Sequence, residues 1–105
     1  MNREAVLDDI PRLLKMGKTF IEKAQVHVGY DKESIENLLT GLIENEDGLV
    51  LIAAQSMFGA VIYAHPFNNA HRVAQELFWW SEGREGIALL KEAETRLSKR
   101  SDSMV

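Results

Sequence analysis

Residues 72–98 read RVAQELFWWSEGREGIALLKEAETRLS, and this stretch decides the fold because its hydrophobic period changes part-way along. Apolar residues alternate over 72–80, which predicts a β-strand with residues 74, 76, 78 and 80 on one face and residues 73, 75, 77 and 79 on the other. After a glycine-rich turn, apolar residues recur at helical spacing up to about residue 99. The stretch therefore predicts a strand, a turn and a helix in direct succession.

The turn SEGREG, residues 81–86, places two glycines and an arginine at the start of the predicted helix. Backbone N–H groups in the first turn of a helix lack partners within the helix, and the helix dipole makes that end attractive to an anion. Arg84 would add a charge-assisted hydrogen bond to a phosphate. A turn of this kind also connects many strands to helices without binding anything, so a phosphate site here is a hypothesis.

Two further helices are predicted upstream, over residues 8–25 and 31–44, where apolar residues recur three and four positions apart. The apolar stripes consist of Ile10, Leu13, Leu14, Ile21 and Ala24, with Phe20 beside them, and of Ile35, Leu38, Leu39, Leu42 and Ile43. The expected capping residues are Asp8 or Asp9 for the first helix, with Pro11 in its first turn, and Asp31 or Ser34 for the second.

A β-hairpin is predicted between the second helix and the long strand. Its strands are the apolar runs 49–54 and 59–64, and residues 55–59 form the turn between them. Residues 65–69, HPFNN, are expected to form a loop, because proline cannot donate to a strand ladder and asparagine tolerates turn geometry. Residues 101–105 are polar and are expected to form a frayed tail.

The composition fits one small domain spanning residues 1–105, with 46% hydrophobic and 27% charged residues. The chain contains no cysteine, which excludes disulfides, thiolate zinc sites and a cysteine nucleophile. Its longest apolar run, 49–54, is far shorter than the roughly 20 residues that cross a membrane. The acidic opening MNREAVLDDI lacks the features of a secretory signal, so we expect a cytoplasmic protein without membrane association.

The net charge of −4 comes from residues 1–71, which hold 6 basic and 10 acidic side chains, whereas residues 72–105 hold 6 of each. A nucleic-acid-binding protein would show a basic face, and none is visible, so no nucleic-acid partner is expected. Any phosphate site would be local and would lie in the C-terminal third. His27, His65 and His71 lack metal-ligand spacing, and no metal site is expected.

Three motifs carry a resemblance to a known family: DDIPRLL at 8–14, ELFWW at 76–80 and GREGIALL at 83–90. Together with the order of elements, they resemble the GCN5-related N-acetyltransferase family over the first two-thirds of its domain. The resemblance implies an α+β fold with a mixed, mainly antiparallel sheet flanked by helices. It also implies a strand before the first helix, and a bulge at the end of the strand 72–80.

In this family the activity is acetyl-CoA-dependent transfer of an acetyl group to a primary amine. The resemblance implies that the bulge binds the pantetheine arm of acetyl-CoA and that the following loop binds its pyrophosphate. The cofactor-binding residues that it implies are Phe78, Trp79, Trp80, Gly83, Arg84, Glu85, Gly86, Ile87 and Ala88. Glu76 is the implied general base, since only a neutral amine attacks a thioester. Backbone N–H groups near Trp79 and Trp80 would polarise the thioester carbonyl.

The sequence departs from the family pattern at several points. If Gly86 and Ala88 are the Gly-x-Gly/Ala pair of the loop, Gly83 stands at the position usually held by arginine or glutamine, and Arg84 comes one place late. The family's usual proline after the strand is missing. We expect the domain to be incomplete at its C-terminus, lacking the last strands and the tyrosine general acid, to which neither Tyr30 nor Tyr63 corresponds.

Alternative interpretations remain open at this stage. The alternative for Glu76 is a solvated strand residue, and Trp79 and Trp80 are more simply core or interface aromatics. If the strand 72–80 lies at a sheet edge, it would favour pairing between copies, so a homo-oligomer is expected. The alternative to an active acetyltransferase is an inert module that binds CoA or a protein partner and self-associates through this strand. An unrelated small α+β interaction domain is the third possibility.

Overall fold

The computed structural model describes residues 2–23 and 29–105. At its centre is a five-stranded sheet in the order β1-β2-β3-β4-β5, antiparallel except for the parallel pair β4 and β5. The elements are β1 (Arg3–Glu4), the 3-10 helix η1 (Leu7–Asp9), α1 (Ile10–Lys23), α2 (Lys32–Glu44), β2 (Gly48–Ile52), β3 (Ser56–His65), β4 (Asn68–Ser81), α3 (Gly86–Ser98) and β5 (Ser103–Met104). The predicted α+β class with a mainly antiparallel sheet is confirmed.

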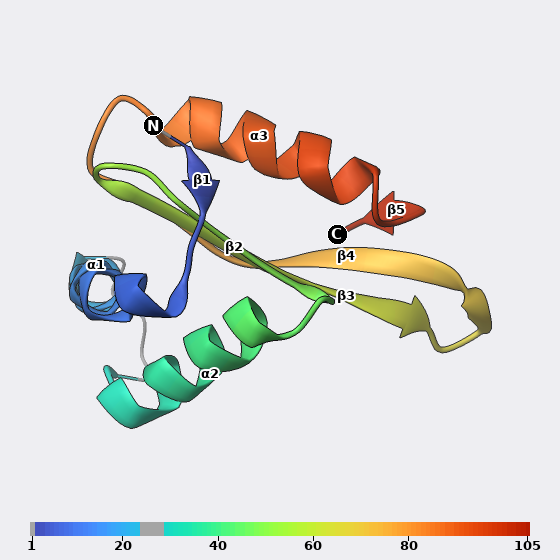
Figure 1. Cartoon of the computed structure of the whole chain (residues 1–105), viewed down its shortest axis with the longest axis horizontal. Coiled ribbons are helices and arrows are strands. Elements are labelled where there is room, and N and C mark those ends of the chain that lie inside the picture. Colours follow the sequence, from blue (N-terminus) through green and yellow to red (C-terminus); the bar gives the residue numbers. More distant parts are fainter. Residues whose placement is uncertain (1, 24–28) are drawn as a thin grey trace.

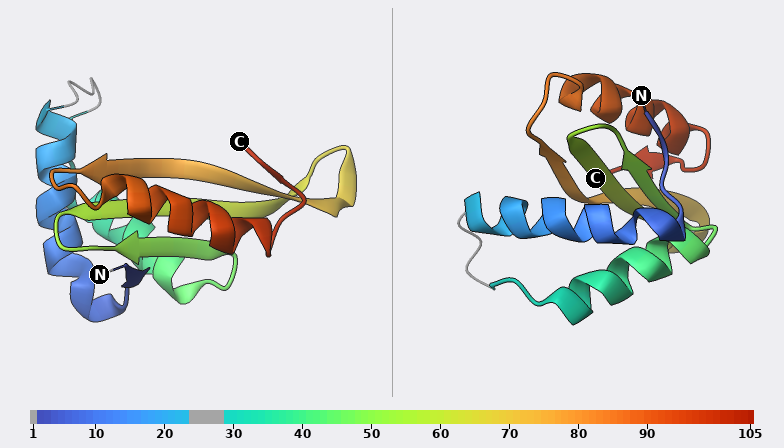
Figure 2. Two further views of the ribbon diagram at one scale, coloured as in Figure 1. Left: turned by 90° about the horizontal axis from the view of Figure 1, so that it is seen from above. Right: turned by 60° about the vertical axis from the view of Figure 1, so that its left-hand side comes forward.

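Helices cover both faces of the sheet, with α1 and α2 on one side and α3 on the other (Figure 1, Figure 2). The strand β2 is buried on both faces, and its side chains divide between two cores. Leu49 and Leu51 belong to the core that contains Leu89 of α3. Val50 belongs to the core that contains Leu13 of α1. Burial on both faces explains why this strand is a continuous apolar run instead of an alternating one.

Both predicted upstream helices are present. Pro11 lies in the first turn of α1, where its missing N–H costs nothing. The segment 8–25 differs at its start, because residues 7–9 form a 3-10 turn, and its predicted end, Ala24 included, lies outside the described residues. Asp31 occupies the N-cap position of α2, but its carboxylate contacts the hydroxyl of Ser34 instead of a backbone N–H.

Arg3 and Asp9 fasten the N-terminal strand to the start of α1. Two guanidinium nitrogens of Arg3 donate to the two carboxylate oxygens of Asp9 at 2.7 Å each, and the backbone N–H of Val6 donates to Asp9 Oδ2 at 2.8 Å. The hydrogen bonds from Arg3 lower the pKa of Asp9 to about 2. The carboxylate of Asp9 therefore stabilises this corner in its ionised form.

The hairpin of β2 and β3 is confirmed, but its turn is shorter than predicted because β3 already begins at Ser56. The loop predicted over 65–69 is also shorter. Asn68 and Asn69 belong to β4, and His65 pairs directly with Asn68 across a turn at Pro66 and Phe67. The side chain of His65 caps this turn by accepting from the backbone N–H of Phe67 at 3.0 Å.

The predicted frayed tail is wrong, because residues 103–104 form β5 alongside β4. Arg72 and Asp102 exchange two bonds: Asp102 Oδ2 accepts from the backbone N–H of Arg72, and the N–H of Asp102 donates to Arg72 O, both at 2.8 Å. The N–H of Val105 donates to Ala74 O at 2.8 Å. A two-residue strand has no hydrophobic period, so the sequence pattern could not reveal it.

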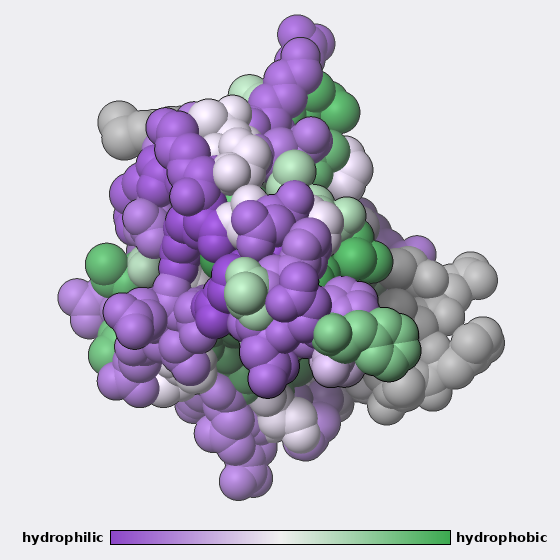
Figure 3. Space-filling model, turned by 90° about the vertical axis from the view of Figure 1, so that its right-hand side faces the viewer, coloured by the Kyte–Doolittle hydropathy of each residue, from purple (hydrophilic) through white to green (hydrophobic). Residues whose placement is uncertain are grey.

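The end of the sheet where β3 turns into β4 is mainly hydrophilic, with small separate hydrophobic areas (Figure 3). Phe67, at the tip of this turn, is the most exposed of the described large apolar side chains, at 94%. A single exposed side chain of this kind is common on globular proteins. None of the helices in the described part of the chain is long and apolar enough to cross a membrane.

Candidate functional site

A β-bulge interrupts β4 at Leu77. Glu76 lies opposite Ala60 of β3 and Phe78 lies opposite Gly59, so Leu77 is an extra residue in the ladder. In such a bulge two residues of one strand oppose one residue of the other, which bends the strand and redirects its side chains. The bulge that the family resemblance implied at the end of this strand is therefore present.

The bulge shifts the alternation of β4 by one residue. Glu76 projects to the same face of the sheet as Ala60, which belongs to the core under α3, because directly opposed residues project to the same side of a sheet. Phe78 and Trp80 pack in the other core, toward α1 and α2. The prediction that residues 74, 76, 78 and 80 share one face is therefore wrong beyond residue 76, since a period of two assumes an unbroken ladder.

Gly59 makes room for the bulge. A Cβ built at this glycine would lie 2.9 Å from Phe78 Cδ2 and closer still to the ring atoms Cε2 and Cζ. Carbon atoms in contact normally lie about 3.5–4.0 Å apart, so no side chain fits beneath the ring as it stands. The ring of Phe78 thus lies directly over the backbone of β3.

The pairing of β4 with β5 ends at the bulge. Its last bond among the described residues runs from the N–H of Glu76 to Val105 O, at 3.1 Å. Within the described part of the chain, residues 77–81 have no strand paired on that side. The backbone there is free to pair with an extended ligand, because an unpaired strand edge presents N–H and C=O groups at regular intervals.

The turn after β4 is tightly organised around Ser81. The hydroxyl of Ser81 donates to Gly83 O at 2.8 Å and accepts from the N–H of Gly83 at 3.3 Å. Gly86 is buried against Ser81, and a Cβ at Gly86 would lie 2.5 Å from the Ser81 Cβ. This close approach holds the first turn of α3 against the end of β4.

The first turn of α3 has backbone N–H groups without partners in the helix, with Gly86 buried and Ile87 and Ala88 exposed. The first i to i−4 bond of this helix is donated by Leu89 to Glu85 O, at 2.9 Å. The N–H groups of Gly86, Ile87 and Ala88 precede it and have no partner within the helix. Bulge, open strand edge and helix start therefore follow one another over residues 76–88.

The sequence and the fold were compared with those of known proteins. No family model and no curated protein matches the sequence. A predicted acetyltransferase from Clostridium acetobutylicum, solved with acetyl-CoA, superposes with a TM-score of 0.83 at 13% identity, over 100% of this chain and 78% of that chain. The chain has the GCN5-related N-acetyltransferase fold.

Two further structures with this fold have named acceptors. An aminoglycoside acetyltransferase from a soil metagenome, solved with trehalose, gives a TM-score of 0.72 at 10% identity, over 100% of this chain and 74% of that chain. A ribosomal-protein-alanine N-acetyltransferase from Brucella melitensis gives 0.69 at 13% identity, over 100% and 78% of the two chains. Identities this low establish the acetyltransferase fold, and the named acceptors belong to those proteins.

The three aromatic residues expected at the cofactor site are anchored in the protein interior through their side chains. Trp79 packs against the core under α3 and donates its indole N–H to Gly86 O at 3.2 Å, which ties β4 to α3. Trp80 packs on Phe20 of α1, with ring centroids 5.5 Å apart. Both indoles therefore pack in the two cores, so Trp79 and Trp80 are placed to meet a cofactor through their backbone, whereas the ring of Phe78 packs toward α1 and α2.

Glu85 lies differently from what a phosphate-binding loop requires. Its carboxylate folds back over Gly83 and accepts a hydrogen bond of 2.6 Å from the hydroxyl of Ser56, which is fully buried. Ser56 also lies 2.7 Å from Ser81. A carboxylate therefore already occupies part of the turn where an anion is expected. Sequence analysis missed this contact because Ser56 lies 29 residues away in the chain.

The two charged candidates of the site, Arg84 and Glu76, are both exposed. Arg84 makes no side-chain hydrogen bond or ion pair with the described residues, so it is available for a phosphate. Glu76 projects to the α3 side of β4, beside the last bond to β5. The remaining loop residues, Ile87 and Ala88, are exposed at the first turn of α3.

The histidines stand apart from this site. His65 is the last residue of β3, and Nε2 of His71 lies 2.9 Å from the hydroxyl of Ser103. His27 lies outside the described residues. Within residues 2–23 and 29–105, no group of three or more acidic, histidine or cysteine side chains could hold a metal ion.

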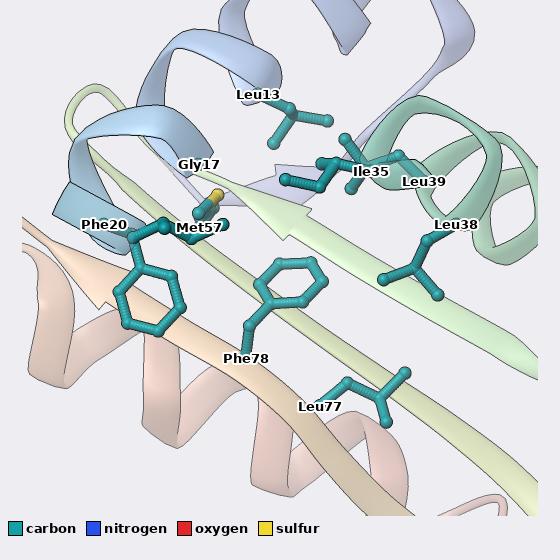
Figure 4. A pocket seen from close by; sticks show the side chains of 10 residues that line it. Leu13, Gly17, Phe20, Ile35, Leu38, Leu39, Met57, Leu77 and Phe78 are labelled. Atoms are coloured by element: carbon teal, nitrogen blue, oxygen red, sulfur yellow. The ribbon is translucent and has the colours of Figure 1, made fainter. Parts of the chain in front are cut away.

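An apolar pocket of about 320 Å³ adjoins the bulge on the side of α1 and α2. Figure 4 shows Leu77 and Phe78 projecting from β4 toward the two helices that form the opposite wall. The lining residues are Leu13, Gly17, Phe20, Ile21, Ile35, Leu38, Leu39, Met57, Leu77 and Phe78. Both bulge residues line the pocket only because the bulge turns their side chains to one face, which the alternating sequence pattern did not predict.

Proposed function

We propose that this protein binds acetyl-CoA and transfers its acetyl group to a primary amine. The observation that carries the proposal is the bulge at Leu77, which lies where β4 and β5 part, while the end of β4 leads through one short turn into α3. Several structures with the same fold are named as acetyltransferases, and one of them was solved with acetyl-CoA. The coincidence of these features favours an acyl-CoA site over an unrelated interaction domain.

The turn before α3 has the space and several of the hydrogen-bond donors that the pyrophosphate of CoA needs. Gly86 brings the first turn of α3 against Ser81, where any larger residue would fill the space. The N–H groups of Gly86, Ile87 and Ala88 would donate to phosphate oxygens, and Arg84 would pair with them from solvent. The unpaired edge at residues 77–81 would bind the pantetheine amides as a strand partner.

Glu76 is the proposed general base. It would accept a proton from the substrate ammonium, directly or through one water, because only the neutral amine is a nucleophile. The acetyl thioester supplies the electrophile: the amine nitrogen bonds to the carbonyl carbon, the C–S bond breaks, and CoA leaves as the thiol after taking up a proton. Backbone N–H groups near Trp79 and Trp80 would stabilise the negative charge on the carbonyl oxygen.

Glu85 favours a second candidate function, an inert module that binds CoA weakly or not at all. Its carboxylate lies in the proposed phosphate turn and would repel a pyrophosphate.

The predicted self-association through the tryptophan-bearing strand would have to use the backbone edge at 77–81, because both indoles pack inside the protein. The mass of the purified protein in solution tests that prediction.

Calorimetric titration with acetyl-CoA is the first test. Saturable binding at micromolar concentration is expected, and Gly86→Glu should abolish it by placing bulk and negative charge in the turn. Gly41→Glu is the matched control, since a Cβ at Gly41 meets nothing within 4 Å. Arg84→Glu changes only an exposed side chain, and should weaken binding even if the Gly86 variant fails to fold. A folded parent that binds no acetyl-CoA would contradict the proposal.

A further inference from the structure

We infer that the acceptor is a primary amine carrying an alkyl or aryl group, which the pocket between α1, α2 and the bulge would bind. The inference rests on the proposed acetyl transfer and names the class of acceptor. Leu77 and Phe78 connect the two sites, because they form the bulge and also line the pocket. A molecule lying in the pocket would reach the part of β4 where the thioester is expected.

The chemistry of the lining selects the acceptor. Every described residue that lines the pocket is leucine, isoleucine, phenylalanine, methionine or glycine. A second ammonium group placed there would lose its water without gaining a partner, which is strongly unfavourable. A hydrocarbon chain would instead gain affinity, by about fourfold for each methylene buried. Polycationic acceptors, the chemistry of an aminoglycoside, therefore do not fit this pocket.

The size and position of the pocket agree with a small amine. About 320 Å³ lies at the lower end of the usual range for small-molecule sites, roughly 300–1,000 Å³. Its walls come from four elements, α1, α2, β3 and β4, which only the fold brings together (Figure 4). Glu76 lies on the other face of β4 at the same point along the strand. The edge of β4 becomes unpaired directly after Glu76, so a water at this edge would have to relay the proton between the two faces of the strand.

The direct test compares two amines of equal length with acetyl-CoA as donor. Hexylamine should be acetylated with a kcat/KM at least about tenfold above that of 1,6-diaminohexane, and kcat/KM should rise from propylamine to hexylamine. Equal or greater activity toward the diamine would overturn the inference while leaving the acetyltransferase proposal intact. Absence of acetyl-CoA binding would instead contradict the proposed function.

Two variants separate the pocket from the rest of the site. Leu38 is 43% exposed at the pocket, so Leu38→Glu should fold and should shift the preference toward the diamine by placing a carboxylate there. Leu7→Glu is the matched control, at 46% exposure and outside the lining, and should change neither rate. Gly17→Leu should fill the pocket and slow hexylamine more than propylamine. An unchanged preference in the Leu38 variant would refute the assignment.

A binding experiment keeps the inference testable if turnover is absent. Hexylamine alone should bind saturably to the parent chain, with 1,6-diaminohexane binding at least about tenfold more weakly. Gly17→Leu should weaken hexylamine binding, whereas Gly41→Leu, on the exposed part of α2, should leave it unchanged. Equal binding of both amines, or no effect of the Gly17 variant, would contradict the pocket assignment independently of any acetyl transfer.

Discussion

The contact between Gly59 and Phe78 gives the sharpest prediction about the bulge. Replacing Gly59 by alanine would place a Cβ 2.9 Å from Phe78 Cδ2 and closer to two further ring atoms. Since carbon contacts normally begin at about 3.5 Å, the ring would have to retreat by roughly 1 Å or more. Overpacking of this kind costs about 1–3 kcal/mol, and each kcal/mol lowers the Tm of a domain this small by roughly 4–8 °C.

The assay is urea unfolding of four chains: parent, Gly59→Ala, Phe78→Leu and the double variant. If the ring causes the penalty, Gly59→Ala should cost much less in the Phe78→Leu background, with a coupling energy of about 1–2 kcal/mol. Gly41→Ala is the control, because that glycine is exposed in α2 and alanine there should stabilise by about 0.5–1 kcal/mol. A Gly59→Ala chain as stable as the parent, or a penalty unchanged in the double variant, would refute the packing argument.

Three further predictions concern charge. Glu76→Gln should lower kcat at neutral pH by about 10²- to 10⁴-fold while leaving acetyl-CoA affinity unchanged, and a variant as fast as the parent would exclude Glu76 as the base. Glu85→Gln keeps the hydrogen bond from Ser56 and removes the negative charge. Calorimetry should then show that the variant binds acetyl-CoA more tightly than the parent, on the order of tenfold, and weaker binding would contradict the proposed repulsion. The pKa of Asp9 is lowered to about 2 in the folded chain, so the contribution of its carboxylate to stability is complete above about pH 4 and is lost as the pH falls toward 2. The free energy of unfolding, measured from pH 6 to pH 2, should therefore fall less steeply with pH in Asp9→Asn than in the parent, and an equally steep fall would contradict this role of Asp9.

Local patterns were sufficient for most of the elements. Helical spacing identified α1, α2 and α3, because each buries one apolar stripe against the sheet. The apolar run of β2 and the alternation of β4 identified the strands in the same way. The two-residue strands β1 and β5 have no local pattern, since they exist only through their pairing with a longer neighbour. The strand before the first helix was expected only from the family resemblance, and β1 confirms it.

The candidate site was predictable only in part. The glycine-rich turn and its arginine are local signals, and they led to residues 83–88 at the start of α3. The partner of Glu85 was not predictable, because Ser56 comes from the far end of a hairpin. The apolar pocket was not predictable either, because the apolar residues that line it have, within each helix or strand, the same spacing as residues of the hydrophobic core.

By itself, the sequence determined which segments become helices and long strands, because burial of one face imposes a period on each. It also determined where backbone N–H groups would be left free, since a helix that follows two glycines must begin there. The tertiary structure alone decided which way the residues after Glu76 point. The extra residue Leu77 shifts the strand by one, and the shift depends on the space above Gly59 in the neighbouring strand. Side-chain direction beyond a bulge is set by the partner strand, which no local period contains.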